Sequence, residues 1–120
     1  HGYRACLPGR VTPPRHLDVV EAGHPVPDAS GAAAADRALA LAAASGPDDL
    51  LVVLVSGGGS ALWPAYAPGI PLADGRATVE LLLRSGAAIG AARAVGRHLS
   101  RIGGGRVAAA AERGGGEVLA

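Results

Sequence analysis

Six consecutive apolar residues at positions 50–55 lead directly into a glycine-rich segment, and this pair of features limits the fold more than any other. The apolar run does not alternate with polar side chains, which is typical of a strand covered on both faces in a parallel sheet. In an open α/β sheet, ligands bind beyond the carboxyl ends of the strands. The glycine-rich segment would lie at that edge, so the pattern points to a ligand loop.

The glycine-rich segment, called the glycine loop below, consists of Ser56, Gly57, Gly58, Gly59 and Ser60. Its glycines leave backbone N–H groups open to a closely approaching anion, and its serines add hydroxyl donors. The loop matches neither the P-loop, which ends in Gly-Lys-Ser/Thr, nor the dinucleotide fingerprint Gly-x-Gly-x-x-Gly. We predict that it binds phosphate. In a chain with 19 glycines, a flexible connection is the alternative.

Four other segments have the composition or periodicity of regular elements. They are a strand at residues 17–22 and helices at residues 32–44, 76–84 and 89–102. Asp74 is a candidate N-cap for the second helix, and the glycines at 103–105 would end the third. Strands that alternate with helices predict a layered α/β domain with a mostly parallel, Rossmann-like sheet and helices on both faces.

A length of 120 residues fits one domain and excludes a complete two-domain enzyme. The chain is 49% hydrophobic and 18% charged, so it should fold, but many of its apolar residues are alanines that bury little area. We therefore expect a core light in large side chains. Stability would be marginal unless further segments or a partner subunit, such as the second copy in a homodimer, complete that core.

Charge and cysteine content exclude several classes of protein. A net charge of +1 excludes a strongly electrostatic binder of nucleic acid or acidic membranes. A single cysteine, Cys6, excludes an internal disulfide framework and a multi-cysteine zinc site, and we interpret it as a small buried residue. The sequence contains no run of 18 apolar residues, so it predicts no membrane span. Together these features favour a cytoplasmic location.

Two candidate site residues, His24 and Asp28, lie in the proline-rich turn after the strand at 17–22. The imidazole of His24 could act as a general base or bind phosphate, or it could simply bond to the nearby backbone. Asp28 could position Mg²⁺, although its spacing favours a helix N-cap.

The helix predicted at 89–102 carries Arg93, Arg97 and Arg101 at i, i+4 spacing. Such a stripe could bind phosphate or carboxylate, or it could be a solvated face. His98 follows Arg97 directly, so on a helix the two side chains point about 100° apart. Arg106 follows the glycines at 103–105, where a helix N-terminus could bind an anion.

Five segments in this order resemble the bacterial-type glycerate 2-kinase family, and the resemblance extends over residues 16–110. The segments are EAGHPVPD at 21–28, SGGGSAL at 56–62, APGI at 67–70, LRSGA at 83–87 and RHLS at 97–100. In that family an N-terminal α/β domain pairs with a smaller C-terminal domain, and the active site lies between them. The resemblance implies that residues 1–120 are part of the N-terminal domain, that the C-terminal domain lies outside them, and that they are inactive alone.

The resemblance implies ATP-dependent phosphorylation of D-glycerate, with Mg²⁺, to 2-phosphoglycerate. It implies catalytic roles for His24, Arg97 and His98, and it places Asp28 at the cleft as a candidate metal ligand. The residues that it implies for substrate or phosphate binding are the glycine loop, Ser100 and Arg106. Phosphoryl transfer depends mainly on positioning and charge neutralisation, which agrees with this set of residues.

Three positions depart from the family pattern. Arg93 stands where the family has an asparagine. Gly96 stands where the family has an arginine, and Gly103 where it commonly has a lysine. Losing a charge-assisted hydrogen bond costs about 1.5 to 3 kcal/mol. One alternative is therefore a decayed kinase that serves as an anion-binding or subunit-interaction module. Another is a different α/β enzyme with a phosphate loop, such as a sugar-phosphate isomerase.

Overall fold

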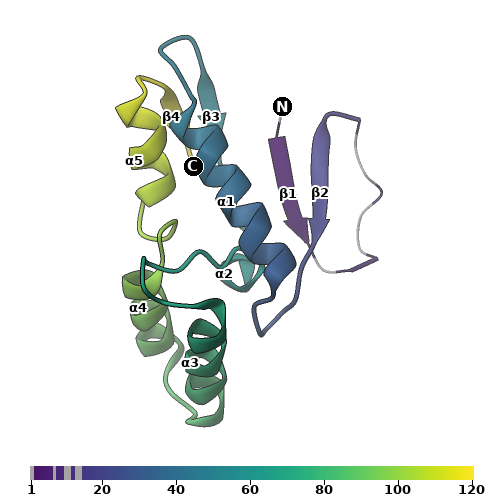
Figure 1. The fold of residues 1–120 in the computed structure, drawn as a ribbon, viewed down its shortest axis with the longest axis vertical. Helices are drawn as coiled ribbons and strands as arrows, with labels where there is room; N and C mark the ends of the chain where they lie inside the picture. The colour runs from purple at the N-terminus through teal and green to yellow at the C-terminus, as the bar shows by residue number, and fades with distance from the viewer. Residues whose placement is uncertain (1, 7, 10–11, 13–14) are drawn as a thin grey trace.

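The computed structural model describes residues 2–6, 8–9, 12 and 15–120 (Figure 1). The elements in this part of the chain are strands and helices, with four successive helices between the last two strands. In order they are β1 (Gly2–Cys6), β2 (Leu17–Glu21), α1 (Ala29–Ala43), β3 (Leu50–Val52), α2 (Gly59–Leu62), α3 (Leu72–Arg84), α4 (Ile89–Leu99), α5 (Arg106–Arg113) and β4 (Glu117–Leu119). The predicted α/β class is confirmed.

The strands form two parallel pairs. In one pair β1 lies beside β2, with Gly2 opposite Leu17, and in the other β3 lies beside β4, with Leu50 opposite Glu117. Figure 1 shows α1 running between the two pairs, and α1 packs against β1, β2 and α5. Parallel pairing was predicted correctly, but the described strands form two separate two-stranded sheets and not one continuous sheet.

The core is built mainly from alanines on α1 and α5, as the composition predicts. Ala35 and Ala42 of α1 and Ala111 of α5 have no exposed surface. Leu51, Val53 and Val118 from the β3–β4 pair pack against the same cluster while staying partly exposed. No large side chain among the described residues is fully buried, so each contact contributes little hydrophobic stabilisation.

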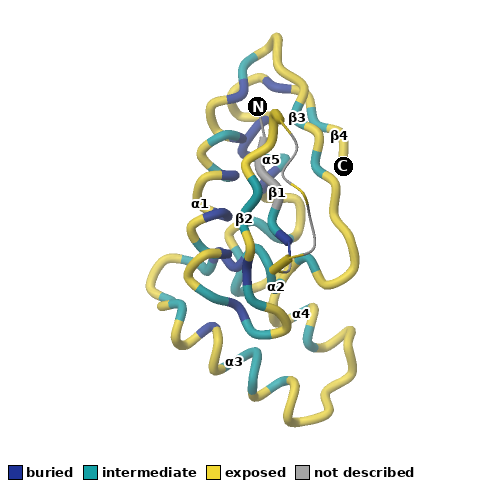
Figure 2. The backbone as a smooth tube through the Cα atoms, turned by 90° about the vertical axis from the view of Figure 1, so that its right-hand side faces the viewer, coloured by how far each residue is buried: buried dark blue, intermediate teal, exposed yellow. Residues whose placement is uncertain are grey.

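The expectation that residues 50–55 form a strand covered on both faces is wrong for this structure. Strand β3 ends at Val52. The last hydrogen bond to the neighbouring strand β4 comes from the next residue, where Val53 N donates to Leu119 O at 2.8 Å. Beyond that point no described strand continues the pairing, and Leu54 and Val55 are 91% and 75% exposed. The largely exposed course of this segment is visible in Figure 2.

Three helix boundaries differ from the prediction by three residues or more. Helix α1 begins at Ala29, directly after its N-cap Asp28, and not at residue 32. Helix α3 begins at Leu72, so Asp74 lies inside its first turn and is not the N-cap. A carboxylate there stabilises the helix by interacting with the positive end of its dipole. Helix α4 ends at Leu99, and Ile102 lies beyond it, packed against the alanine cluster. The predicted stripe of three arginines is therefore broken, because Arg101 is outside the helix.

Candidate functional site

The turn after β2 brings His24 against the glycine loop. A Cβ atom added to Gly58 would lie 2.7 Å from His24 Nε2, so the imidazole occupies the space that a side chain would need. Gly58 also has a φ of +81°, a left-handed conformation that L side chains adopt at a cost. Both constraints require glycine at this position. His24 and Gly58, 34 residues apart in sequence, are thus in direct proximity.

Most donors of the glycine loop have no hydrogen-bond partner among the described residues; Gly59 N, which donates to Ser56 O at 3.2 Å, is an exception. Within the described part of the chain, neither the hydroxyls of Ser56 and Ser60 nor the N–H groups of Gly57 and Gly58 make a hydrogen bond. All four of these residues are exposed. The loop therefore presents backbone and side-chain donors to solvent, beside the His24 ring.

Asp28 holds the turn that carries His24. Its Oδ1 accepts a hydrogen bond from Gly31 N at 2.9 Å, which makes it the N-cap of α1, and its Oδ2 accepts one from Gly23 N at 2.8 Å. The predicted capping role is confirmed. Among the described residues, no group of three or more His, Cys, Asp or Glu side chains is placed to hold a metal ion.

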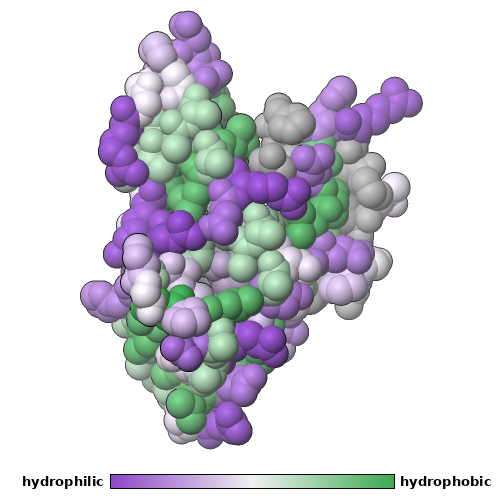
Figure 3. All heavy atoms as spheres, in the orientation of Figure 1, coloured by the Kyte–Doolittle hydropathy of each residue, from purple (hydrophilic) through white to green (hydrophobic). Residues whose placement is uncertain are grey.

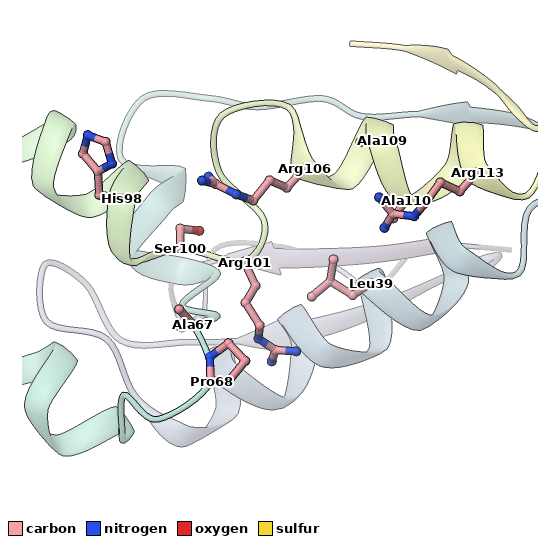
Figure 4. A pocket seen from close by; sticks show the side chains of 10 residues that line it. All are labelled: Leu39, Ala67, Pro68, His98, Ser100, Arg101, Arg106, Ala109, Ala110 and Arg113. Carbon is pink, nitrogen blue, oxygen red and sulfur yellow. The ribbon is translucent and has the colours of Figure 1, made fainter.

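A second group of predicted residues lines an open hollow of about 460 Å³ between α1, α5 and the segments at 67–68 and 98–101 (Figure 4). The predicted residues there are His98, Ser100 and Arg106, joined by Arg101 and Arg113. Figure 4 shows the ring of His98 pointing away from Ser100 and Arg101. No hydrogen bond or ion pair within the described part of the chain links this group to His24 or the glycine loop.

Ser100 and Arg106 are both engaged with the backbone. Ser100 Oγ accepts hydrogen bonds from Ile102 N at 3.1 Å and Gly103 N at 2.8 Å. Arg106 Nη1 donates to Arg97 O at 3.0 Å and Gly103 O at 2.8 Å. Arg106 is also the first residue of α5, so the predicted helix start is confirmed.

The remaining predicted basic residues differ in their surroundings. Arg97 and His98 lie in the last turn of α4 and are exposed. Arg101 donates from Nε to Tyr66 O at 2.8 Å and forms an ion pair with Asp36 of α1. It therefore joins α1 to the segment that follows the glycine loop, a structural role that the helical stripe did not predict. Predicting this role from the sequence would require knowing that the helix ends at Leu99 and not beyond Arg101.

The sequence alone does not identify Tyr66 as a residue near the candidate site. A Cβ atom on Gly75 would lie 2.2 Å from the Tyr66 ring, so this ring packs directly on the backbone of α3. Burial raises the pKa of the Tyr66 phenol above its ordinary value, because desolvation disfavours the phenolate. No local signal marks the pair, because it depends on how α3 packs.

A family profile described as "Domain of unknown function (DUF4147)" matches residues 4–120. The chain belongs to the DUF4147 family. Similar curated proteins include a putative hydroxypyruvate reductase of Agrobacterium vitis, 45% identical over 83% of this chain and 26% of that protein. A glycerate 2-kinase of Pyrococcus horikoshii is 40% identical over 78% of this chain and 21% of its own length. The chain thus spans about a quarter of the length of these relatives.

Solved structures agree with this family assignment. A glycerate kinase of Thermotoga maritima superposes with a TM-score of 0.84 and 33% identity, over 98% of this chain and 28% of that one. A Pyrococcus horikoshii protein superposes with a TM-score of 0.86 and 35% identity, over 98% of this chain and 26% of that one. The resemblance of this DUF4147 chain to glycerate kinases is confirmed. No helix among its described residues has both the length and the apolar character needed to cross a bilayer.

Proposed function

We propose that this chain is the glycine-loop part of a longer, two-domain glycerate 2-kinase that transfers the γ-phosphoryl group of ATP to D-glycerate. The observation that carries the proposal is the glycine loop beside His24, where free N–H and hydroxyl donors meet an imidazole. Similarity to proteins named glycerate 2-kinase supports the substrate. Because the chain spans about a quarter of their length, the activity belongs to the longer protein.

The loop is chemically suited to a phosphate group. Backbone N–H donors of Gly57 and Gly58 and the hydroxyls of Ser56 and Ser60 carry no partner within the described residues, so a bound anion would satisfy them without breaking protein hydrogen bonds. Arg97 and His98, which are exposed in the last turn of α4, would face the substrate or a phosphate. In this proposal His24 stands beside the bound phosphate as donor or general base.

Mg²⁺ fits the described residues less well than phosphate does. Asp28 already uses both carboxylate oxygens for Gly23 N and Gly31 N, and no metal-ligating cluster is present among the described residues. We therefore assign no complete Mg²⁺ site to this chain. Binding of Mg²⁺ stays a prediction for Asp28 alone, and its test is given in the Discussion.

A reductase is the second candidate, because two relatives are named putative hydroxypyruvate reductase. Hydroxypyruvate and glycerate share one carbon skeleton and differ by two electrons and two protons. A reductase would need a nicotinamide cofactor, and the sequence SGGGSAL does not match the dinucleotide fingerprint. The residues present therefore favour the kinase.

The deciding experiment measures ADP release by the full-length protein with ATP, Mg²⁺ and D-glycerate, and identifies the phosphorylated carbon of the product by ³¹P NMR. We expect D-glycerate-dependent ADP release and 2-phosphoglycerate. Absence of ADP release above background would contradict the proposal. Oxidation of NADH or NADPH by hydroxypyruvate, measured on the same preparation, would support the reductase instead.

A decayed kinase is tested at Gly96, the position that departs from the family pattern. Beyond the backbone of α4 itself, a Cβ added there has no described atom within 4 Å, and the position is exposed, so Gly96→Arg starts into open space. Gly96→Ala is the matched control, since it changes the helix propensity without adding a guanidinium. A large gain of kinase activity in Gly96→Arg alone would indicate decay, whereas equal activities would show that the native residue is sufficient.

A further inference from the structure

The connection between α4 and α5, residues 100–105, is held by the two side chains Ser100 and Arg106. Ser100 Oγ accepts from two N–H groups of the connection, those of Ile102 and Gly103. Arg106 Nη1 reaches back to Gly103 O and to Arg97 O in the last turn of α4. A single guanidinium nitrogen thus joins the end of one helix to the turn that starts the next.

Helix chemistry explains why a cation belongs here. The last carbonyls of an α-helix have no partner within the helix, and its C-terminus carries a partial negative charge. Gly104 and Gly105 have φ values of +66° and +83°, and this left-handed bend turns the chain so that Arg106 faces the end of α4. The guanidinium therefore satisfies an otherwise unpaired carbonyl with a charge-assisted bond.

The same connection is bonded to the segment that leaves the glycine loop. Ala67 N donates to Leu99 O at 2.8 Å, and Arg101 N donates to Ala65 O at 2.7 Å. Residues 65–67 come three residues after the end of α2, which itself starts in the glycine loop. Movement of the α4–α5 connection would therefore shift Arg97 and His98 relative to the phosphate loop.

We propose that Arg106 and Ser100 are positioning residues, which hold Arg97 and His98 in place relative to the glycine loop without binding substrate themselves. This inference rests on the proposed kinase function for its catalytic consequence. Its structural basis is independent, because Arg106 Nη1 and Ser100 Oγ already bond to backbone groups. Since phosphoryl transfer depends on alignment, a small displacement of these side chains lowers turnover.

The kinetic test uses Arg106→Met, Arg106→Lys, Ser100→Ala and Ser100→Thr in the full-length protein. Arg106→Met and Ser100→Ala should lower kcat roughly 10- to 100-fold, with the KM values for D-glycerate and ATP changed less than about twofold. Lysine keeps one nitrogen donor and threonine keeps the hydroxyl, so both conservative variants should recover most of kcat. A rise of about tenfold or more in either KM with kcat unchanged would overturn the proposal, since it indicates a direct ligand contact.

Amide hydrogen exchange gives a second readout that does not need activity. Arg106→Met should speed exchange of amides in residues 97–103, and Ser100→Ala should speed exchange at Ile102 and Gly103. Arg113→Met is the matched control: the Arg113 side chain lines the same hollow but makes no hydrogen bond within the described residues, so exchange and kcat should not change. Unchanged exchange in both test variants would overturn the positioning role. A wild-type protein without kinase activity would overturn the proposed function while leaving this exchange test intact.

Discussion

The glycine loop and the α4–α5 connection contain similar residues and use them in opposite ways. Each is a short glycine-rich turn with at least one serine. In the glycine loop, the hydroxyls of Ser56 and Ser60 have no partner within the described part of the chain. In the connection, the hydroxyl of Ser100 accepts from two N–H groups and the Arg106 guanidinium donates to two carbonyls.

The difference distinguishes side chains that are free to bind a ligand from side chains that hold the backbone in its conformation. A donor that is already bonded to the backbone must lose that bond before it can serve a ligand, whereas a solvated donor exchanges water for the ligand at little net cost. The residue type alone therefore does not identify a binding residue. The predictions below test this contrast.

The largest effect is expected for Gly58→Ala in the glycine loop. Its Cβ would displace the His24 ring and strain a φ of +81°, so kcat/KM should fall about 100-fold, and stability should fall by about 1 to 2 kcal/mol. Gly69→Ala is the matched control, since Gly69 has a φ of +86° but nothing within 4 Å of its Cβ position. It should lose similar stability and keep its activity. Equal losses of activity in both variants would show that backbone strain alone is responsible.

Asp28→Ala should give the next largest effect, on stability. It removes the N-cap of α1 and the bond to Gly23 N, and it should lower the free energy of unfolding by about 1 to 2 kcal/mol in a urea titration. Asp28→Asn keeps a capping oxygen and should lose less. If Asp28 binds Mg²⁺, the difference between Asp28→Asn and wild type should instead grow as Mg²⁺ is added.

Arg101→Ala should cost about 1 kcal/mol of stability, because its bonds lie at the surface. The side chains of the Arg101–Asp36 pair are 42% and 62% exposed, so solvent and salt screen them. The loss should shrink at high salt, leaving the contribution of the bond to Tyr66 O. Arg113→Ala, on the other side of the hollow, should change stability by a smaller amount. A loss that does not respond to salt would contradict the ion-pair interpretation.

Gly96→Ala should give the smallest change, a gain in stability of about 0.5 to 1 kcal/mol, because alanine reduces the entropy that an exposed helix position loses on folding. A thermal or urea midpoint measures it. A loss of stability would show that the surface of α4 at this position packs against something in the longer protein.

The two pairs of helices also differ in how far their apolar residues are covered. Figure 3 shows apolar residues among polar ones at the lower end of the molecule, where α3 and α4 lie in Figure 1. On these helices Leu81, Leu83 and Ile89 are 64%, 56% and 72% exposed. The α1–α5 region, in contrast, packs alanine against alanine with little exposed area. Apolar periodicity predicted α3 and α4 but could not tell whether their apolar faces would be covered.

Local patterns in the sequence predicted most of the elements. The proline-rich turn, the N-cap at Asp28 and the alanine-rich run that becomes α1 follow from short-range propensity and capping, and all are present. The predicted start of α5 after the glycines at 103–105 is likewise observed. The ends of β3 and α4 were predicted too late, because a strand ends where its partner ends and a helix can end where its last carbonyls find other donors.

The amino-acid sequence by itself determined the α/β class, the glycine loop and the family, because these depend on residue order and local preference. Only the tertiary structure decided that His24 lies against Gly58, that Arg101 leaves the arginine stripe to join Asp36, and that Ser100 and Arg106 bond to the backbone. Each of these contacts joins groups through space, and whether a donor is free or occupied depends on which acceptor the folded chain brings to it.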